Sequence, residues 1–180
     1  MITNNYISQS SFIGIRVEEE SGGTTIRANY CENNSKAIEV SGSYRTLIEK
    51  NVCKFSEYTG IYIVGSGYSN ILDNNLTSSG FNWYVNQNLE YDLTMSFENN
   101  YVNDKPFVFL TNLTNQTLSS NDFGQLFLMN CSDITIEDLD IRDTSTALAL
   151  AFCSNSTIRN SNFSENTVSG ISLDYSTDIV

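Results

Sequence analysis

Residues 2–6 read ITNNY, and three variants of this phrase follow: IRANY at 26–30, IEKNV at 48–52 and LDNNL at 72–76. The successive steps are 24, 22 and 24 residues. A second phrase recurs in the last third, as GQLFLMNCSDITI (124–136), ALALAFCSNSTI (147–158) and GISLDYSTDIV (170–180). A fixed period of this length indicates a repeat architecture in which each unit stacks on its neighbour.

Apolar positions alternate with other residues inside each unit, as they do in a β-strand. The side chains expected to point into the core are Ile15 and Val17, Ile38 and Val40, Ile61 and Ile63, Leu126 and Leu128, Leu148 and Leu150, and Ile171 and Leu173. Units of 22–24 residues with Gly, Asn and Ser turns leave no room for a helix in each repeat. The pattern therefore predicts an all-β parallel β-helix, with three short strands per coil and coils about 4.8 Å apart.

One asparagine per coil is expected to stack on its copy in the next coil. These ladder residues are Asn5, Asn29, Asn51 and Asn75, with Asp140 and Asn162 in the same register in the last third. Stacked amides satisfy turn backbone groups and one another. The residue after each is then predicted to form a core ladder through Tyr6, Tyr30, Val52, Leu76, Ile141 and Phe163.

The period breaks over residues 77–123, which hold the only Trp, Trp83, and the only Pro, Pro106. We expect irregular coils with a lateral excursion here, with strands near 92–98 and 106–118. Regular coils at 1–76 and 124–180 flank this stretch, so residues 1–180 are predicted to form a single β-helix segment. Because both ends fall within the repeat, we expect the segment to come from a longer protein.

Composition excludes several classes of function. There are 9 basic and 21 acidic residues, a net charge of −12 and no His. The chain therefore lacks the basic surface that binds nucleic acid and the imidazole that Ser-His-Asp or Cys-His catalysis requires. The longest apolar run, ALALAFC at 147–153, is far below the roughly 18 residues of a spanning helix, so we expect no membrane insertion within this segment.

Several stretches resemble the NosD-like right-handed parallel β-helix proteins, namely YVNDKPFVFL (101–110), DFGQLFLMNCSDITIEDLDI (122–141), STIRNSNFSENTVSGISL (156–173) and the earlier coils. These proteins are similar to the carbohydrate-binding and sugar-hydrolase β-helix domain, and the resemblance covers essentially the whole chain. It implies a right-handed coil and an extracellular, cell-surface or periplasmic location. The named member of the family serves copper maturation of nitrous oxide reductase.

Polysaccharide-acting enzymes of this fold use carboxylates, often with calcium and a basic partner. The acidic cluster at 137–143 supplies Asp138 and Asp140 as the catalytic candidates. The structural alternative is a set of solvated turn carboxylates, with Arg159 stacked over Glu137 as a cross-strand pair. Because His is absent, the sequence favours a chain without catalytic activity.

Metal sites have few candidate ligands. Glu18, Glu19 and Glu20 precede a Gly-Gly corner and could hold calcium through clustered carboxylates, or could form a solvated loop. Copper prefers His, Met or Cys, and the chain offers only Met95, Met129 and four cysteines inside the repeats. No cofactor other than calcium is expected.

The cysteines form two pairs one coil apart, Cys31 with Cys53 and Cys131 with Cys153. The spacing between coils permits a disulfide. A ladder of free, half-buried thiols is the favoured alternative, because side chains on adjacent in-register parallel strands run alongside one another.

Exposed aromatic rings stack on sugar faces, while amides bind the hydroxyl groups. The carbohydrate-binding candidates are Tyr62, Trp83 and Tyr84, and further tyrosines lie on nearby loops and in the irregular stretch, namely Tyr44, Tyr58, Tyr68 and Tyr91. Aromatic residues are equally typical of core ladders and of caps, and this alternative stays open.

Together these features favour an acidic, non-catalytic β-helix module of an exported or cell-surface protein. Such a module would serve as a scaffold, adhesin or carbohydrate-contact surface, with glycans or other surface-protein domains as partners. Two alternatives remain open: a fragment of a polysaccharide lyase, hydrolase or epimerase, and a NosD-type periplasmic accessory protein in copper-enzyme maturation.

Overall fold

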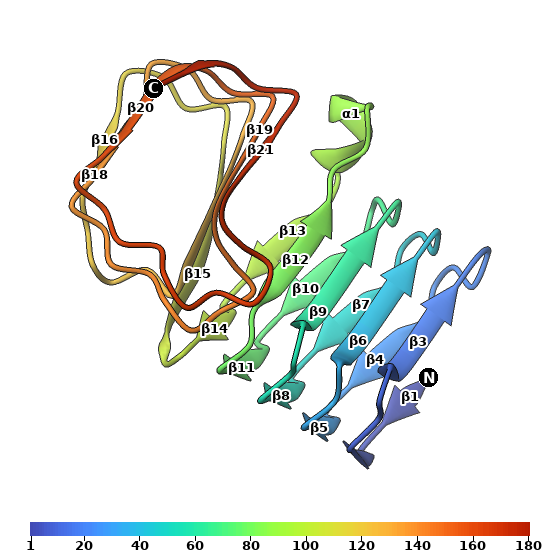
Figure 1. Ribbon diagram of the computed structural model, residues 1–180. Helices are drawn as coiled ribbons and strands as arrows, with labels where there is room; N and C mark the ends of the chain where they lie inside the picture. Colours follow the sequence, from blue (N-terminus) through green and yellow to red (C-terminus); the bar gives the residue numbers. More distant parts are fainter.

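The computed structural model describes residues 1–180 as 22 short strands and one turn of helix, α1 (Leu89–Asp92). The strands form about 8 coils of a parallel β-helix, which confirms the predicted fold class. The coils make two stacks, residues 1–102 and residues 105–180. In Figure 1 the first stack is seen from the side and the second as nested loops seen end-on, so the two stacks run in different directions.

Three parallel sheets form the walls of the first stack. The first sheet contains β1 (Ile2–Thr3), β4 (Thr25–Arg27), β7 (Leu47–Glu49), β10 (Asn70–Leu72) and β13 (Ser96–Glu98). The second contains β2 (Tyr6–Ser8), β5 (Tyr30–Glu32), β8 (Val52–Lys54), β11 (Asn75–Thr77) and β14 (Tyr101–Val102). The third contains β3 (Ile13–Glu18), β6 (Lys36–Ser41), β9 (Thr59–Val64) and β12 (Phe81–Tyr84).

The second stack has two parallel walls and a third side of loops. One wall contains β15 (Lys105–Thr111), β17 (Gln125–Met129), β19 (Thr146–Ala151) and β21 (Ser169–Asp174). The other contains β16 (Thr117–Leu118), β18 (Thr135–Glu137), β20 (Ser154–Arg159) and β22 (Thr177–Ile179). On the third side Asp140 bridges to Asn162 in the next coil.

The asparagine ladder runs through Asn5, Asn29, Asn51, Asn74 and Asn100. Each side-chain Nδ2 donates to Oδ1 of the next copy at 2.9–3.0 Å. The prediction that placed Asn75 in this ladder is wrong by one residue. Ile71, rather than Leu72, pairs with Ile48, so this coil step is 23 residues, and Asn75 starts β11 with its side chain exposed.

The predicted core ladder after the asparagines is confirmed at Leu76, Ile141 and Phe163, which lie in or against the core, and is wrong at the first three positions. Where an asparagine points inward, the next side chain points outward and the one after it inward. Tyr6, Tyr30 and Val52 therefore lie on the outer face, which corrects their placement in the core. The inward ladder is Ile7, Cys31, Cys53, Leu76 and Val102.

The aliphatic positions predicted from strand alternation are buried in β3, β6, β9, β17 and β19. Ile171 and Leu173 pair with Leu148 and Leu150 as expected. Their side chains are nevertheless exposed, because β21 lies at the edge of its sheet.

The stretch 77–123 divides into two parts of different kinds. The first continues the first stack, since β12 pairs with β9, β13 with β10 and β14 with β11. The second starts at Asn103 and Asp104, whose φ angles are +52° and +60°. This two-residue turn has the positive φ angles of a type I′ hairpin, and β15 pairs antiparallel with β14. The hairpin turns the chain into the second stack.

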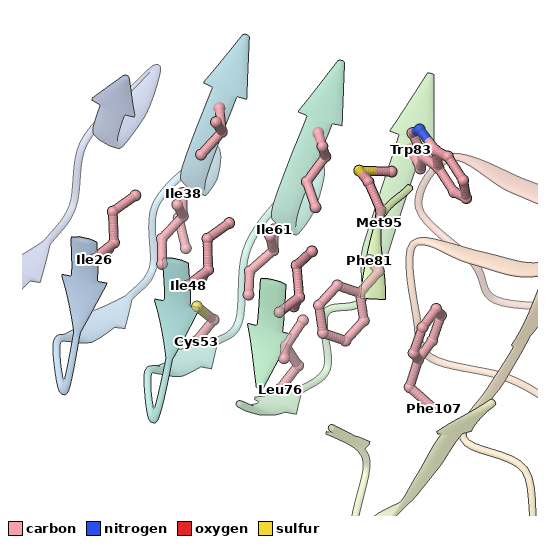
Figure 2. Packing of buried hydrophobic residues seen from close by; sticks show 14 of the residues in the cluster. Ile26, Ile38, Ile48, Cys53, Ile61, Leu76, Phe81, Trp83, Met95 and Phe107 are labelled. Carbon is pink, nitrogen blue, oxygen red and sulfur yellow. The ribbon is translucent and has the colours of Figure 1, made fainter. Parts of the chain in front are cut away.

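Aromatic side chains fill the seam between the two stacks (Figure 2). Phe81, Trp83 and Phe97 of the first stack meet Phe107 and Phe109 of the second, with ring centroids 4.6–5.5 Å apart. Trp83 is only 8% exposed. It is a core residue of the seam, which corrects its selection as a surface ring for sugar binding.

The Gln125 side chain makes the hydrogen bonds to β12 that a strand of a further coil would otherwise make. Its Oε1 accepts from the Phe81 N–H at 2.9 Å, and its Nε2 donates to the carbonyls of Phe81 and Thr146, both at 2.6 Å. A Cβ at Gly80 would lie 2.0 Å from Thr144 Oγ1, so the close approach of the stacks requires glycine. Side chains of the second stack thus close the open edge of the first.

Candidate functional site

Three tyrosines converge at one corner of the first stack. This tyrosine corner is formed by Gly22, Gly23, Tyr44, Arg45, Tyr68 and Tyr91 around a cavity of about 460 Å³. Tyr44 and Tyr68 are 47% and 55% exposed. The Tyr91 ring stands edge-on to both, at centroid distances of 5.8 and 6.2 Å. The corner therefore presents accessible ring surface inside a hollow.

Tyr91 is fixed by backbone groups of the loop after β9. Its hydroxyl accepts from the Gly67 N–H at 2.7 Å and donates to the Gly65 carbonyl at 3.0 Å. A Cβ at Gly67 would lie 2.6 Å from the Tyr91 ring, so glycine lets the ring lie against the coil. Burial raises the pKa of Tyr91, so this hydroxyl stays protonated and keeps its bond to Gly65.

The glycines of the first coil leave the cavity open on one side. The Gly23 N–H donates to the Tyr44 carbonyl at 2.9 Å, which places Gly22 and Gly23 directly below Tyr44 and Arg45. They carry no side chains to fill the space, and Gly23 has φ +75°. Arg45 takes no part in the six ion pairs of the chain, so its guanidinium is available to a ligand.

The structure distributes the predicted sugar-binding residues over two environments. Tyr62 and Tyr84 lie on the outer faces of β9 and β12, while Trp83 points into the seam. Tyr62 is half-buried, and Lys36 Nζ lies 4.3 Å from its ring centroid. No cavity is lined by Tyr62 or Tyr84, and their binding role stays a prediction.

Sequence reasoning did not identify the tyrosine corner as one site. The available signal was spacing, because Tyr44, Tyr68 and Tyr91 are 24 and 23 residues apart, which is one coil each.

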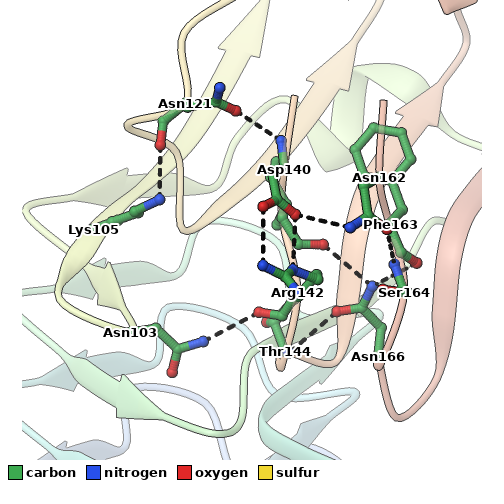
Figure 3. A network of polar contacts seen from close by, with 11 residues as sticks. Asn103, Lys105, Asn121, Asp140, Arg142, Thr144, Asn162, Phe163, Ser164 and Asn166 are labelled. Carbon is green, nitrogen blue, oxygen red and sulfur yellow. Dashed lines mark hydrogen bonds and ion pairs between the residues drawn. The ribbon is translucent and has the colours of Figure 1, made fainter. Parts of the chain in front are cut away.

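A second cavity, of about 180 Å³, lies where the two stacks meet (Figure 3). This junction pocket is lined by Asn103, Lys105, Phe123, Gly124, Asp140, Ile141 and Arg142. Asp140 forms a bidentate ion pair with Arg142, with Nε–Oδ1 at 2.8 Å and Nη2–Oδ2 at 3.0 Å. Lys105 Nζ donates to the Asn121 carbonyl at 2.7 Å.

The two catalytic candidates are not brought together. Asp140 lines the junction pocket, whereas Asp138 is an exposed corner residue with φ +56° outside it. Glu137 pairs with Arg159 across one coil, with Nε–Oε2 at 2.7 Å. The pocket thus holds one carboxylate, already paired with arginine, whereas glycoside hydrolysis uses two carboxylates flanking the bond.

The donor set for a metal ion is poor. No group of three or more His, Cys, Asp or Glu side chains is placed to hold one. Glu18 pairs with Arg16, and Glu19 and Glu20 are exposed. Met95 and Met129 are buried in the core, so the soft ligands that copper prefers do not form an accessible site. The residues present do not fit copper.

The four cysteines are free and buried. Cys31 pairs in register with Cys53, and the N–H of Ser154, next to Cys153, bonds to the Cys131 carbonyl. The Cys153 thiol donates to the Ala151 carbonyl at 3.3 Å, and the interaction between the two thiols lowers the pKa of Cys131 to about 7 and raises that of Cys153. In the first stack the Cys53 thiol likewise lowers the pKa of Cys31. Each pair lies within the core, where solvent does not reach the sulfurs.

The only helix of the chain has four residues, and no helix is long and apolar enough to cross a membrane.

Comparison with known protein families gives two matches. Residues 110–180 match the family described as right handed beta helix region. Residues 1–124, more than two-thirds of the chain, match the family described as periplasmic copper-binding protein (NosD). A search of curated proteins found no match. The coil register and the match to the right handed beta helix region show that the chain is a right-handed β-helix module, and the NosD match over more than half of its length shows that it belongs to the NosD family.

Proposed function

We propose that this chain is a non-catalytic module of an exported protein that contacts neutral carbohydrate through the tyrosine corner. The observation that carries the proposal is the 460 Å³ cavity framed by Tyr44, Tyr68 and Tyr91. Flat rings pack against the apolar faces of pyranoses, and Tyr44 is uncovered on the side of Gly22. The unpaired Arg45 guanidinium supplies donors for sugar hydroxyl groups.

Charge favours neutral over acidic saccharides. The chain carries a net charge of −12, and Glu18, Glu19 and Glu20 lie on the coil just before Gly22. Anionic polymers are repelled by such a surface, while neutral sugars are unaffected. Glycans of the cell envelope, or the glycosylated domains of neighbouring surface proteins, are the partners that this chemistry fits.

An extracellular or periplasmic location is part of the proposal. It is supported by membership of a family described as periplasmic. The same membership supports a second candidate role, as an accessory protein in copper-enzyme maturation. In that role this segment would act through its surface, because its four cysteines, Met95 and Met129 are buried.

The test is calorimetric titration with neutral oligosaccharides chosen from a glycan array. We expect Tyr44→Ala and Tyr68→Ala to weaken binding at least tenfold, because each removes a ring that frames the cavity. Tyr101→Ala is the matched control, since Tyr101 is 46% exposed, close to the 47% of Tyr44, but lines no cavity. Chain-length analysis of the same glycans after incubation should show no cleavage.

Two results would contradict the proposal. Binding that survives Tyr44→Ala and is lost in Tyr84→Ala would move the site to the outer face of β9 and β12. Cleavage that disappears in Asp140→Asn would show that the junction pocket is an active site.

A further inference from the structure

We propose that the junction pocket is a binding site for a small carboxylate. Three separate segments build it: the hairpin turn with Asn103 and Lys105, the loop before β17 with Phe123, and the corner with Asp140 and Arg142. Its volume of about 180 Å³ is about six times the roughly 30 Å³ share of one liquid water. That space suits an anion with a short carbon chain.

The unused hydrogen-bonding capacity of the pocket consists mainly of donors. A guanidinium has five N–H groups and an ammonium has three. Arg142 uses two of its five on Asp140, which leaves three, and Lys105 uses one of its three on the Asn121 carbonyl, which leaves two. The acceptors are largely occupied, because Asp140 Oδ1 also accepts from Asn162 Nδ2 at 3.1 Å.

The charge of the pocket and its apolar lining favour a carboxylate over other ligands that accept hydrogen bonds. Asp140 and Arg142 neutralise each other, so the pocket keeps the positive charge of Lys105. Bonds from a cationic donor to an anionic oxygen are shorter and stronger than those to a neutral hydroxyl. The Phe123 and Ile141 side chains line the same cavity and offer an apolar surface to the carbon chain.

Nearby acidic groups do not reverse this preference. The Asp143 carboxylate is bonded to Ser78 Oγ at 2.8 Å and does not line the pocket. Asp104 and Asp122 are sequence neighbours of the lining residues Lys105 and Phe123, but neither carboxylate lines the pocket, and Asp122 accepts from Ser120 Oγ at 3.1 Å. The site accepts one small anion and offers no extended basic groove for an acidic polymer.

The proposal is tested by NMR titration of the whole chain with butyrate, with n-butanol as the uncharged probe of equal chain length. We expect saturable amide shifts confined to 103–105, 121–124 and 140–142 with butyrate, and none with n-butanol. Lys105→Gln should weaken butyrate binding at least tenfold. Arg159→Gln is the matched control, because Arg159 pairs with Glu137 outside the pocket, and it should leave the affinity within twofold.

Other outcomes overturn the assignment. Equal shifts from n-butanol would show that the apolar wall alone binds. Inorganic phosphate competing as strongly as butyrate would show a general anion site, and an unchanged affinity in Lys105→Gln would remove the cation from it. Arg142→Gln should also weaken binding tenfold; if it unfolds the chain, Lys105→Gln decides. The test is independent of the tyrosine corner, which shares no residue with this pocket.

Discussion

A single buried amide can form hydrogen bonds to the coils on both sides of its own. Asn51 Oδ1 accepts from both the backbone N–H and Nδ2 of Asn29, at 3.0 Å each. Its own Nδ2 donates to the Ile26 carbonyl and to Asn74 Oδ1, also at 3.0 Å. All four bonds lie in the interior, where an unpaired polar group costs about 1–3 kcal/mol. The ladder therefore fixes coil register as well as adding stability.

We expect Asn51→Ala to lower the free energy of unfolding by at least about 3 kcal/mol, because it leaves several buried groups unpaired. Asn75→Ala is the matched control at the neighbouring exposed position and should change stability by less than about 0.5 kcal/mol. Urea denaturation followed by circular dichroism measures both. Equal losses in the two variants would contradict the register in which Asn74 carries the ladder.

Asp92 is an ionisable residue whose burial opposes its charge. It is 2% exposed, and burial raises its pKa from 3.8 to about 6, although the Asn86 N–H donates to it. Because the native state favours the protonated form, this carboxyl stabilises the fold most below about pH 4 and loses that effect as pH rises through 6.

Asp92→Asn should therefore raise the free energy of unfolding at pH 7.5 by up to about 2–3 kcal/mol, while an amide oxygen still accepts from Asn86. At pH 4 the two proteins should differ little. Urea midpoints at the two pH values measure the effect. If Asp92→Asn is less stable than the parent chain at pH 7.5, the surroundings of Asp92 favour its charged carboxylate, and the prediction is wrong.

At the scale of elements, the strands were predictable because one face of each is apolar. Ile38 and Val40 in β6, or Leu148 and Leu150 in β19, alternate with other residues, and this pattern alone indicates inward and outward faces. The error at Asn75 has a local cause. Asn74 and Asn75 are adjacent and identical, so either fits a period of 22–24 residues, and only backbone pairing of Ile71 with Ile48 decides between them.

The tyrosine corner was harder to predict from sequence than the strands. Side-chain direction in corner loops follows no regular period. The strand pattern therefore does not reveal that Tyr44 and Tyr68 line one cavity with Tyr91. The prediction that Trp83 is a surface ring was wrong for a different reason. Trp83 lies in a strand, and the residue that covers its ring is Phe109, which follows the hairpin that starts the second stack.

At the scale of the whole molecule, the fold depends on contacts that no repeat encodes. The sequence predicts a single β-helix segment with irregular coils and a lateral excursion over 77–123. Within that stretch the turn at Asn103 and Asp104 starts a second stack, which β14–β15 pairing, Gln125 and the seam aromatics attach to the first. Asn-Asp suits positive φ, yet the direction of the second stack follows from packing across residues distant in sequence.

Gln125→Leu is expected to uncouple the two stacks. Leucine keeps the volume but leaves the Phe81 N–H and the carbonyls of Phe81 and Thr146 unpaired in the seam, at a cost of about 1–3 kcal/mol per group.

Trp83 lies in this seam, so its fluorescence reports the contact, while circular dichroism reports the strands of both stacks. In the parent chain the two signals should change at the same unfolding midpoint, as in a two-state transition. In Gln125→Leu the fluorescence transition should come first, whereas Gln116→Leu, at an exposed glutamine, should leave both midpoints in place. Coincident and unshifted transitions in Gln125→Leu would mean that the Gln125 hydrogen bonds are not needed to hold the stacks together.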